Sequence, residues 1–104
     1  MYVRIVTFRL DGLGAEDYLR HAEQLAPAFR DWPGLHAKIW LADPERAVYG
    51  GVYLFASKAD ADASRDTEIF RGMQADPAYA ELTVREFETL AAPSAVTAPA
   101  FVGS

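Results

Sequence analysis

His36, Lys38 and Trp40 are the residues of this sequence best suited to chemistry, because they occupy every second position of one short stretch. In a β-strand, alternate side chains share a face, so the three would point in one direction. A lysine in an apolar cavity could stabilise an anion, and a histidine, whose ordinary pKa lies near neutrality, could act as an acid or a base. Either residue could equally be a solvated side chain of a strand.

The extended stretch 48–55 adds aromatic residues in the same alternating manner. We expect its aliphatic positions, with those of 35–41, to pack on helices, which leaves the aromatic positions with Lys38 on the opposite face. The aromatic set would either stack on a flat ligand or pack against itself; it consists of Trp40, Tyr49, Tyr53 and Phe55. Arg4 would join this face if the strand register permits. The side chain of His21 could point into a cavity between helix and sheet, or it could lie at the boundary of a helix without a catalytic role.

Periodicity predicts the elements that position these residues. Helices are expected after Gly14, Ser57 and Thr67, residue types that begin helices, and strands over 2–10, 35–41, 48–55 and 82–90. The order strand, helix, strand, strand, helix, strand is that of a ferredoxin-like α+β domain (βαββαβ), a four-stranded antiparallel sheet with helices on one face. We place this domain at residues 1–93. The Ala/Pro-rich tail, 94–104, would be disordered or form an arm over a neighbouring subunit.

The sheet face without helices needs another cover. If the aromatic set lies there, a monomer would expose an apolar patch of a kind that soluble proteins rarely leave bare. A homodimer formed through the open sheet face would cover it. The aromatic residues would then either fill the dimer interface or line a cavity for a small aromatic or hydrophobic ligand.

Composition excludes several classes of protein. The sequence contains no cysteine, so a disulfide scaffold, a thiol nucleophile and a thiolate metal site are excluded, and two histidines far apart give no metal-ligand spacing. Ten basic residues among fifteen acidic ones argue against a nucleic-acid partner. No apolar stretch predicts a membrane span or a leader peptide, so we expect a cytoplasmic protein. Gly50 and Gly51 lie inside a strand and indicate close packing or a bulge, not a phosphate loop.

Three motifs resemble the YdhR-type monooxygenase family, a member of the dimeric α+β barrel group. They are Trp32-Pro33-Gly34-Leu35, the run Ala37–Leu41, and Tyr49-Gly50-Gly51-Val52-Tyr53-Leu54-Phe55. The resemblance implies a homodimer with a cavity, and a cofactor-independent oxygenase that stabilises the anion of a phenolic substrate. Lys38, His36 and His21 would then be catalytic, and Trp40, Tyr49, Tyr53, Phe55 and Arg4 would bind the substrate, with no metal. Haem-degrading relatives rely on an asparagine, which this sequence lacks.

Two other functions stay open. The first is a non-catalytic dimer that binds a small hydrophobic molecule. The second is an isomerase or decarboxylase that uses a histidine or a carboxyl group for proton transfer. A basic group held inside a cavity, away from solvent, would favour an enzyme over a binding protein.

Overall fold

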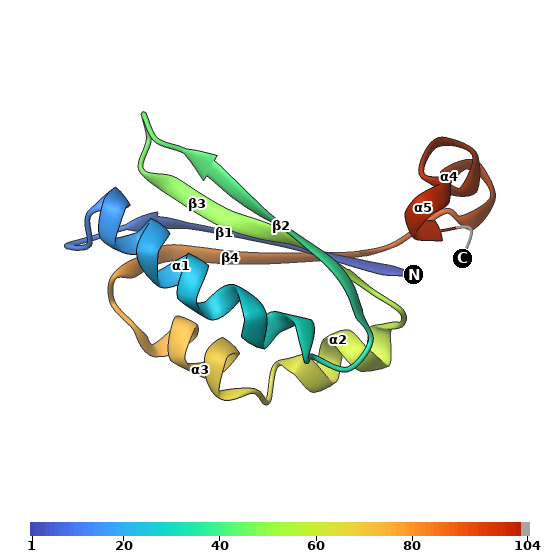
Figure 1. The fold of residues 1–104 in the computed structure, drawn as a ribbon, viewed down its shortest axis with the longest axis horizontal. Coiled ribbons are helices and arrows are strands. Elements are labelled where there is room, and N and C mark those ends of the chain that lie inside the picture. Colours follow the sequence, from blue (N-terminus) through green and yellow to red (C-terminus); the bar gives the residue numbers. More distant parts are fainter. Residues whose placement is uncertain (103–104) are drawn as a thin grey trace.

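The computed structural model describes residues 1–102 (Figure 1). In chain order the elements are β1 (Tyr2–Leu10), α1 (Ala15–Arg30), β2 (Leu35–Asp43), β3 (Val48–Phe55), α2 (Lys58–Ser64), α3 (Glu68–Ala75), β4 (Tyr79–Glu88), α4 (Ala91–Thr97) and α5 (Pro99–Val102). Each of these helices is too short or too polar to cross a membrane.

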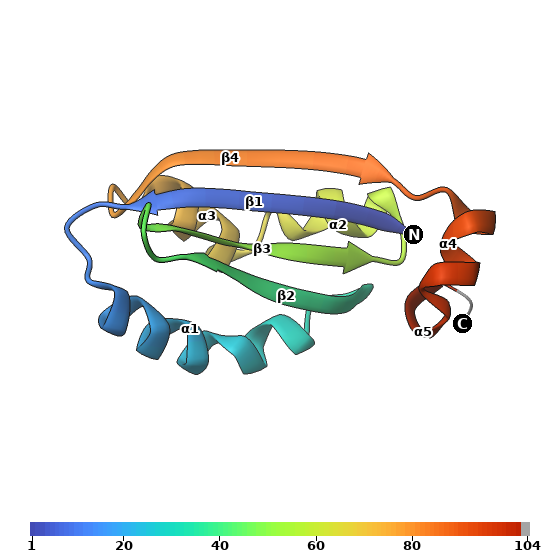
Figure 2. The same cartoon turned by 90° about the horizontal axis from the view of Figure 1, so that it is seen from above.

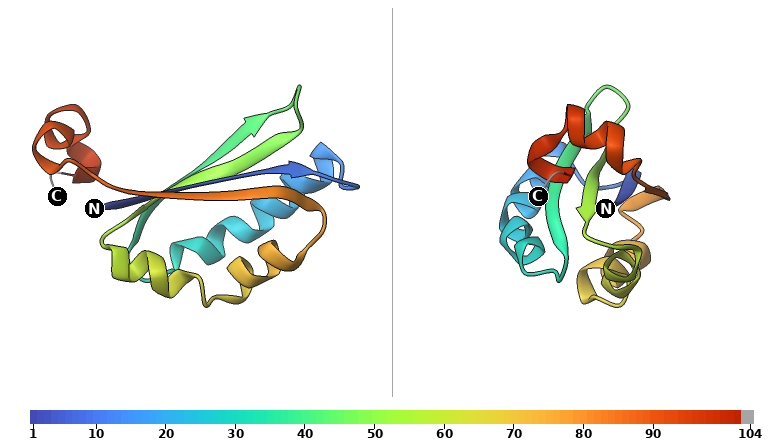
Figure 3. Two further views of the ribbon diagram at one scale, coloured as in Figure 1. Left: turned by 180° about the vertical axis from the view of Figure 1, so that it is seen from behind. Right: turned by 90° about the vertical axis from the view of Figure 1, so that its right-hand side faces the viewer.

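The four strands form one antiparallel sheet in the order β2-β3-β1-β4, which Figure 2 shows from above. Both central strands are flanked by hydrogen-bonded neighbours, and β1 pairs with β3 on one side and with β4 on the other. Helices α1, α2 and α3 lie on the same side of the sheet, while the other face carries none of them (Figure 3). The fold is therefore the ferredoxin-like α+β fold predicted from the sequence.

Two side-chain caps divide the segment after β3 into separate helices, as predicted. The Ser57 hydroxyl accepts a hydrogen bond from the Asp60 amide, 3.1 Å away, and donates to the Asp60 carboxylate at 2.9 Å. The Thr67 hydroxyl likewise accepts from the Phe70 amide at 3.2 Å. Each cap satisfies an amide that the first turn of a helix leaves unpaired. The chain can therefore change direction between α2 and α3.

The assignment of the two sheet faces was wrong. The aromatic residues lie on the face that the helices cover: Tyr49, Tyr53 and Phe55 are buried, and Trp40 packs against the core. The aliphatic set lies on the open face, where 57% of Ile39 is exposed.

Helix α1 explains this inversion. Its inner side and the turn after it present large rings, and these pack on the rings of the sheet, in the pairs Tyr18–Tyr49, Phe29–Trp40 and Trp32–Tyr53. Aromatic pairs gain about 0.5–1.5 kcal/mol beyond the burial of their area. Aliphatic residues facing the same helix would lose these contacts.

A bulge in β2 separates His36 from Lys38. Leu35 lies opposite Phe55, but Ala37 lies opposite the neighbouring residue, Leu54, so one residue of β2 is extra. His36 is exposed whereas Lys38 is partly buried, so the two side chains have different surroundings although strict alternation would place them together.

The last strand and the tail also differ in their details. β4 begins at Tyr79, earlier than predicted, and ends at Glu88. For the tail, we expected disorder or an arm; the structure has the short helices α4 and α5, beyond the end of the sheet at which the N-terminus lies (Figure 1). Contact between this segment and a neighbouring subunit stays a prediction, and residues 103–104 lie outside the described range.

Candidate active site

A cavity of about 340 Å³ lies between the sheet and helices α1 and α3. This volume falls in the lower part of the range of small-molecule sites, which begins near 300 Å³. Most of its walls are apolar, and the lining residues are Val6, Phe8, Tyr18, His21, Ala22, Leu25, Phe29, Lys38, Trp40, Gly50, Gly51, Tyr53, Glu68, Ile69, Gly72, Met73, Asp76 and Tyr79.

Lys38 lies in this cavity within a cage of aromatic rings. Its Nζ is 3.4 Å from the ring centroid of Phe29, 3.4 Å from that of Trp40 and 4.6 Å from that of Tyr53. Among residues 1–102, no carboxylate forms an ion pair with this amine, although seven other basic side chains have one. Lys38 is thus a partly buried basic group whose amine lies against apolar rings.

Burial lowers the pKa of Lys38 to about 7, because the apolar surroundings disfavour the ammonium ion. The ring faces act in the opposite direction, since their quadrupoles attract a cation by up to about 2 kcal/mol when it is desolvated. At neutral pH, Lys38 can therefore both accept a proton and hold it. That is the property required of a general base near its working pH.

Glycine at position 51 makes room for the lysine side chain. A Cβ added at Gly51 would lie 2.9 Å from Cε of Lys38 and 3.3 Å from a ring carbon of Tyr53. At Gly50 an added Cβ would meet the backbone oxygen of Val6 at a distance that no side chain tolerates. Both glycines are thus close-packing positions within a strand, as one reading of the sequence predicted.

The tyrosines around the cavity remain protonated hydroxyl groups. Burial, together with the nearby Tyr79 and Tyr49, raises the pKa of Tyr18 to about 12. Burial also raises the pKa of Tyr53 far above its ordinary value, although the positive charge of Arg4 opposes this. Both hydroxyls can therefore donate hydrogen bonds to an oxygen of a ligand.

The cavity brings together half of the residues that we predicted for a site. Lys38, Trp40, Tyr53 and His21 line it, and the exposed His21 lies on α1. Tyr49 and Phe55 are buried nearby but are not among the lining residues.

His36 lies at a different hollow, between β2 and the second half of α1. This hollow has a volume of about 380 Å³, and Phe29, Lys38 and Trp40 line it as well as the first cavity. Glu23 and Arg30 of α1 are its charged residues besides Lys38. His36 is thus separated from the first cavity by the rings that surround Lys38.

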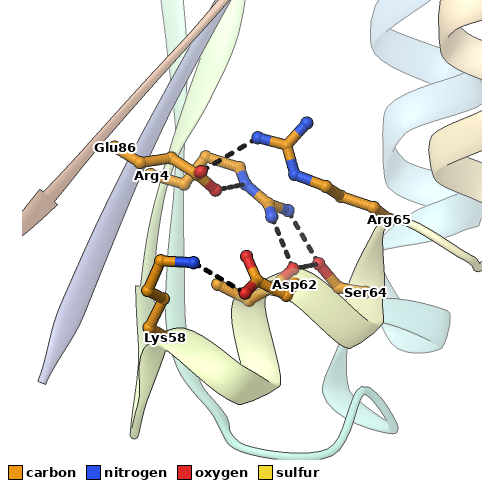
Figure 4. A network of polar contacts seen from close by, with 7 residues as sticks. Arg4, Lys58, Asp62, Ser64, Arg65 and Glu86 are labelled. Carbon is orange, nitrogen blue, oxygen red and sulfur yellow. Dashed lines mark hydrogen bonds and ion pairs between the residues drawn. The ribbon is translucent and has the colours of Figure 1, made fainter.

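Arg4 belongs to a polar network rather than to the cavity wall (Figure 4). Its guanidinium is fully buried; Nε donates to Glu86 Oε2 at 2.8 Å, and Nη1 donates to the Ser64 hydroxyl at 2.7 Å. Nη2 donates to the carbonyl of Ala61. These bonds join β1 to α2 and β4. They leave Arg4 poorly placed for a substrate.

The carboxylate of Glu86 accepts hydrogen bonds from two arginines in this network. Arg65 donates to its other carboxylate oxygen at 2.9 Å. Burial by itself would raise the pKa of Glu86, but the hydrogen bonds and charges of Arg4 and Arg65 outweigh it and hold the pKa below its usual value. The network is therefore an ion-paired structural centre.

Sequence reasoning missed the contributions of α1, α3 and β4 to the cavity. Tyr18 and Phe29 of α1 and Tyr79 of β4 line the cavity, but none of the three is among the predicted site residues. Glu68 and Asp76, at the two ends of α3, are the acidic lining residues. The apolar spacing of Ile69 and Met73 on α3 was the one signal for this wall. It could not be distinguished from ordinary core packing.

The fold and the enclosed basic group together define a class: a ferredoxin-like α+β protein with an aromatic small-molecule cavity. The chain belongs to the ydhR family, whose description is "Putative mono-oxygenase ydhR" and whose model matches residues 4–100. The family is monooxygenase-like. No curated protein matches the chain.

Solved structures share the fold at low sequence identity. An antibiotic biosynthesis monooxygenase is 18% identical, with a TM-score of 0.70, and the match covers 86% of this chain and 99% of the other. SnoaB, a cofactor-independent oxygenase from Streptomyces nogalater, is 15% identical, with a TM-score of 0.67 and coverage of 86% and 92%. MhuD, a heme degrader from Mycobacterium tuberculosis with two hemes bound, is 16% identical, with a TM-score of 0.68 and coverage of 86% and 96%.

Proposed function

We propose that this protein is a cofactor-independent monooxygenase that acts on a small aromatic or quinol-type molecule in the cavity between sheet and helices. The observation that carries the proposal is the partly buried amine of Lys38 against three aromatic rings, with no carboxylate partner among residues 1–102. The family supports an oxygenase, and SnoaB offers a precedent for oxygenation without a cofactor on this fold.

In this mechanism Lys38 removes the proton of a phenolic hydroxyl. The resulting ammonium ion then lies beside the phenolate and stabilises it in a poorly hydrated site, where such an interaction is stronger than in water. The ring faces of Trp40 and Tyr53 would stack on the substrate. A ring carbon of the anion forms a bond to O₂, and the resulting hydroperoxide loses water to leave a quinone, so that one oxygen atom enters the product and the other leaves as water. His21 is the second group of the cavity that could transfer a proton.

Oxygen uptake with a panel of small hydroquinones tests the proposal. We expect the wild type to consume O₂ and Lys38→Met to be slower by about 100-fold or more, the usual contribution of a general base. Activity should rise with pH through about 7, because the neutral amine is the active form. Lys58→Met, which changes an exposed lysine, is the matched control.

Equal uptake by wild type and Lys38→Met would contradict this role of Lys38. If quinols bind in the cavity but no O₂ is consumed, the non-catalytic binding protein is the better description. Proton exchange or loss of CO₂ from a bound substrate without O₂ would instead favour the isomerase or decarboxylase.

We also propose that two copies pair through the open sheet face, now on aliphatic rather than aromatic residues. On that face 57% of Ile39 is exposed, and so is 51% of Phe87. Exposed apolar patches of this kind mark interfaces. Light scattering should give the mass of a dimer, and Ile39→Lys should shift it toward a monomer; a monomeric wild type would contradict the pairing.

A further inference from the structure

The sequence contains two lysines, and the structure places them in opposite surroundings. The Nζ of Lys58 is 2.8 Å from Oδ2 of Asp62, and 60% of this lysine side chain is exposed. Hydrogen bonding to Asp62 and its negative charge raise the pKa of Lys58. Lys58 is therefore an ordinary solvated ammonium ion, and it differs from Lys38 in accessibility, charge partner and acidity.

The cage around Lys38 leaves its nitrogen lone pair without a competitor. Nζ lies 3.4 Å from the ring centroids of both Phe29 and Trp40, and such ring faces attract a cation but donate no proton to a neutral amine. A hydrogen-bond donor there would occupy the lone pair and weaken the nucleophile. A desolvated lysine amine of this kind is an activated nucleophile toward carbonyl carbon.

We propose that Lys38 captures small aromatic aldehydes in the cavity as a covalent imine. The lone pair of Nζ forms a bond to the aldehyde carbon, and the carbonyl π electrons move to the oxygen. Proton transfer from nitrogen to oxygen then lets the oxygen leave as water, so that amine plus aldehyde gives imine plus water. No oxidant or reductant takes part. The reaction uses the same cavity as the proposed oxygenation but does not depend on it.

The cavity supplies the conditions that such an adduct needs. Its mostly apolar walls reduce the contact of the imine with water, and its rings match a flat ligand. Room beside Cε comes from the missing side chain of Gly51. The other titratable groups that line the cavity, and that could supply or accept a proton during the loss of water, are Tyr18, His21, Tyr53, Glu68, Asp76 and Tyr79.

The charged and titratable groups of the second hollow also face Lys38. They are Glu23, Arg30 and His36. None of them forms an ion pair with Lys38 in the described residues, so the amine remains available on the cavity side.

Reductive trapping tests the inference. The full chain is incubated at pH 7 under argon with benzaldehyde and cyanoborohydride, which converts an imine into a stable benzylamine. Peptide mass mapping then gives the rate of benzylation at Lys38, at Lys58 and at the terminal amino group separately. We expect Lys38 to react at least about 100-fold faster than Lys58, because a far larger fraction of it is neutral at this pH. Exclusion of oxygen makes the outcome independent of any oxygenase activity.

Two variants complete the test. Lys38→Met should retain only the slow reaction of the terminal amine and of Lys58, with an unchanged circular dichroism spectrum. Lys58→Met should be trapped at Lys38 as fast as the wild type. Equal rates at the two lysines of the folded wild type, or labelling confined to the terminal amine, would overturn the inference. Trapping without O₂ uptake in the hydroquinone assay would support imine formation and contradict the oxygenase proposal.

Discussion

Arg4 and Lys38 are two cations on the same face of the same sheet, both directed toward the helices, yet their surroundings differ completely. Arg4 is fully buried, and its guanidinium donates to a carboxylate, a hydroxyl and a carbonyl. Lys38 has three aromatic rings and no carboxylate partner among residues 1–102. A cation with saturated hydrogen bonds stabilises the fold, whereas an unpaired one costs stability. The unpaired one is therefore the candidate for function.

Removal of Arg4 should have the largest effect on stability. Arg4→Met leaves the Ser64 hydroxyl without its donor, the carbonyl of Ala61 with the Ser64 hydroxyl as its side-chain donor, and Glu86 with one arginine. Loss of one member of a buried ion pair costs about 3–5 kcal/mol, so we expect the free energy of unfolding in urea to fall by about 3 kcal/mol. Arg9→Met on the same strand is the control.

Arg9 forms an exposed ion pair with Glu81, with 42% and 74% of the two side chains accessible. Its loss should cost less than about 1 kcal/mol. Similar losses for the Arg4 and Arg9 variants would mean that the network is not the structural centre described above.

Removal of Lys38 should raise the free energy of unfolding, whereas removal of Arg4 lowers it. Between pH 7 and pH 10.5 the unfolded chain binds a proton at Lys38 that the folded chain does not bind, so wild-type stability rises with pH across this window. Lys38→Met lacks this dependence. It should be more stable than wild type at pH 7 by about 1–2 kcal/mol, since one pKa unit corresponds to about 1.4 kcal/mol and the rings offset part of the cost.

Urea denaturation of both proteins at several pH values measures this difference. The gap should narrow as the pH approaches 10.5, and the exposed Lys58→Met should show no such trend. A gap that is constant with pH would show that the lysine is not penalised by burial.

A methyl group at position 51 should have the smallest effect on stability, but it should slow the reaction of Lys38. Gly51→Ala pushes against Cε, the far part of a flexible side chain, so we expect a cost near about 1 kcal/mol and benzaldehyde trapping slower by about 10-fold. Gly72 lies in helix α3 with open space around an added Cβ, so Gly72→Ala should increase the free energy of unfolding by about 0.5–1 kcal/mol. An unchanged rate of benzaldehyde trapping in Gly51→Ala would show that Gly51 does not determine the position of Lys38.

The order of strands and helices along the chain and the residues at which the helices begin could be predicted from the sequence, because alternation and the N-cap residues Ser57, Thr67 and Gly14 act locally. The face of the sheet that the helices cover could not be predicted. Alternation divides β3 into two sets, but it does not say which set meets the helices. The rings of Tyr18, Phe29 and Trp32 were the missing guide, since aromatic helix residues favour aromatic partners on the sheet.

The site itself could be predicted only in part, for a related reason. Lys38, Trp40 and Tyr53 are close in sequence and share a face, so their association follows from strand pairing. His36 lines the second hollow with Lys38 and Trp40 but not the first cavity, and the extra residue of β2 beside it leaves no mark on composition. Tyr79 and Glu68 reach the cavity only through the packing of α3 and β4, which is a tertiary property.

The aromatic cage also gives the protein an optical reporter. The chain has two tryptophans: Trp40 lines the cavity, and Trp32 stacks on Tyr53 with ring centroids 6.0 Å apart. Its tryptophan fluorescence therefore arises at or beside the cavity. A ligand that quenches tryptophan, such as a quinone or an aromatic aldehyde, would darken the unlabelled wild-type protein as it binds, so affinity could be measured without any chemical step.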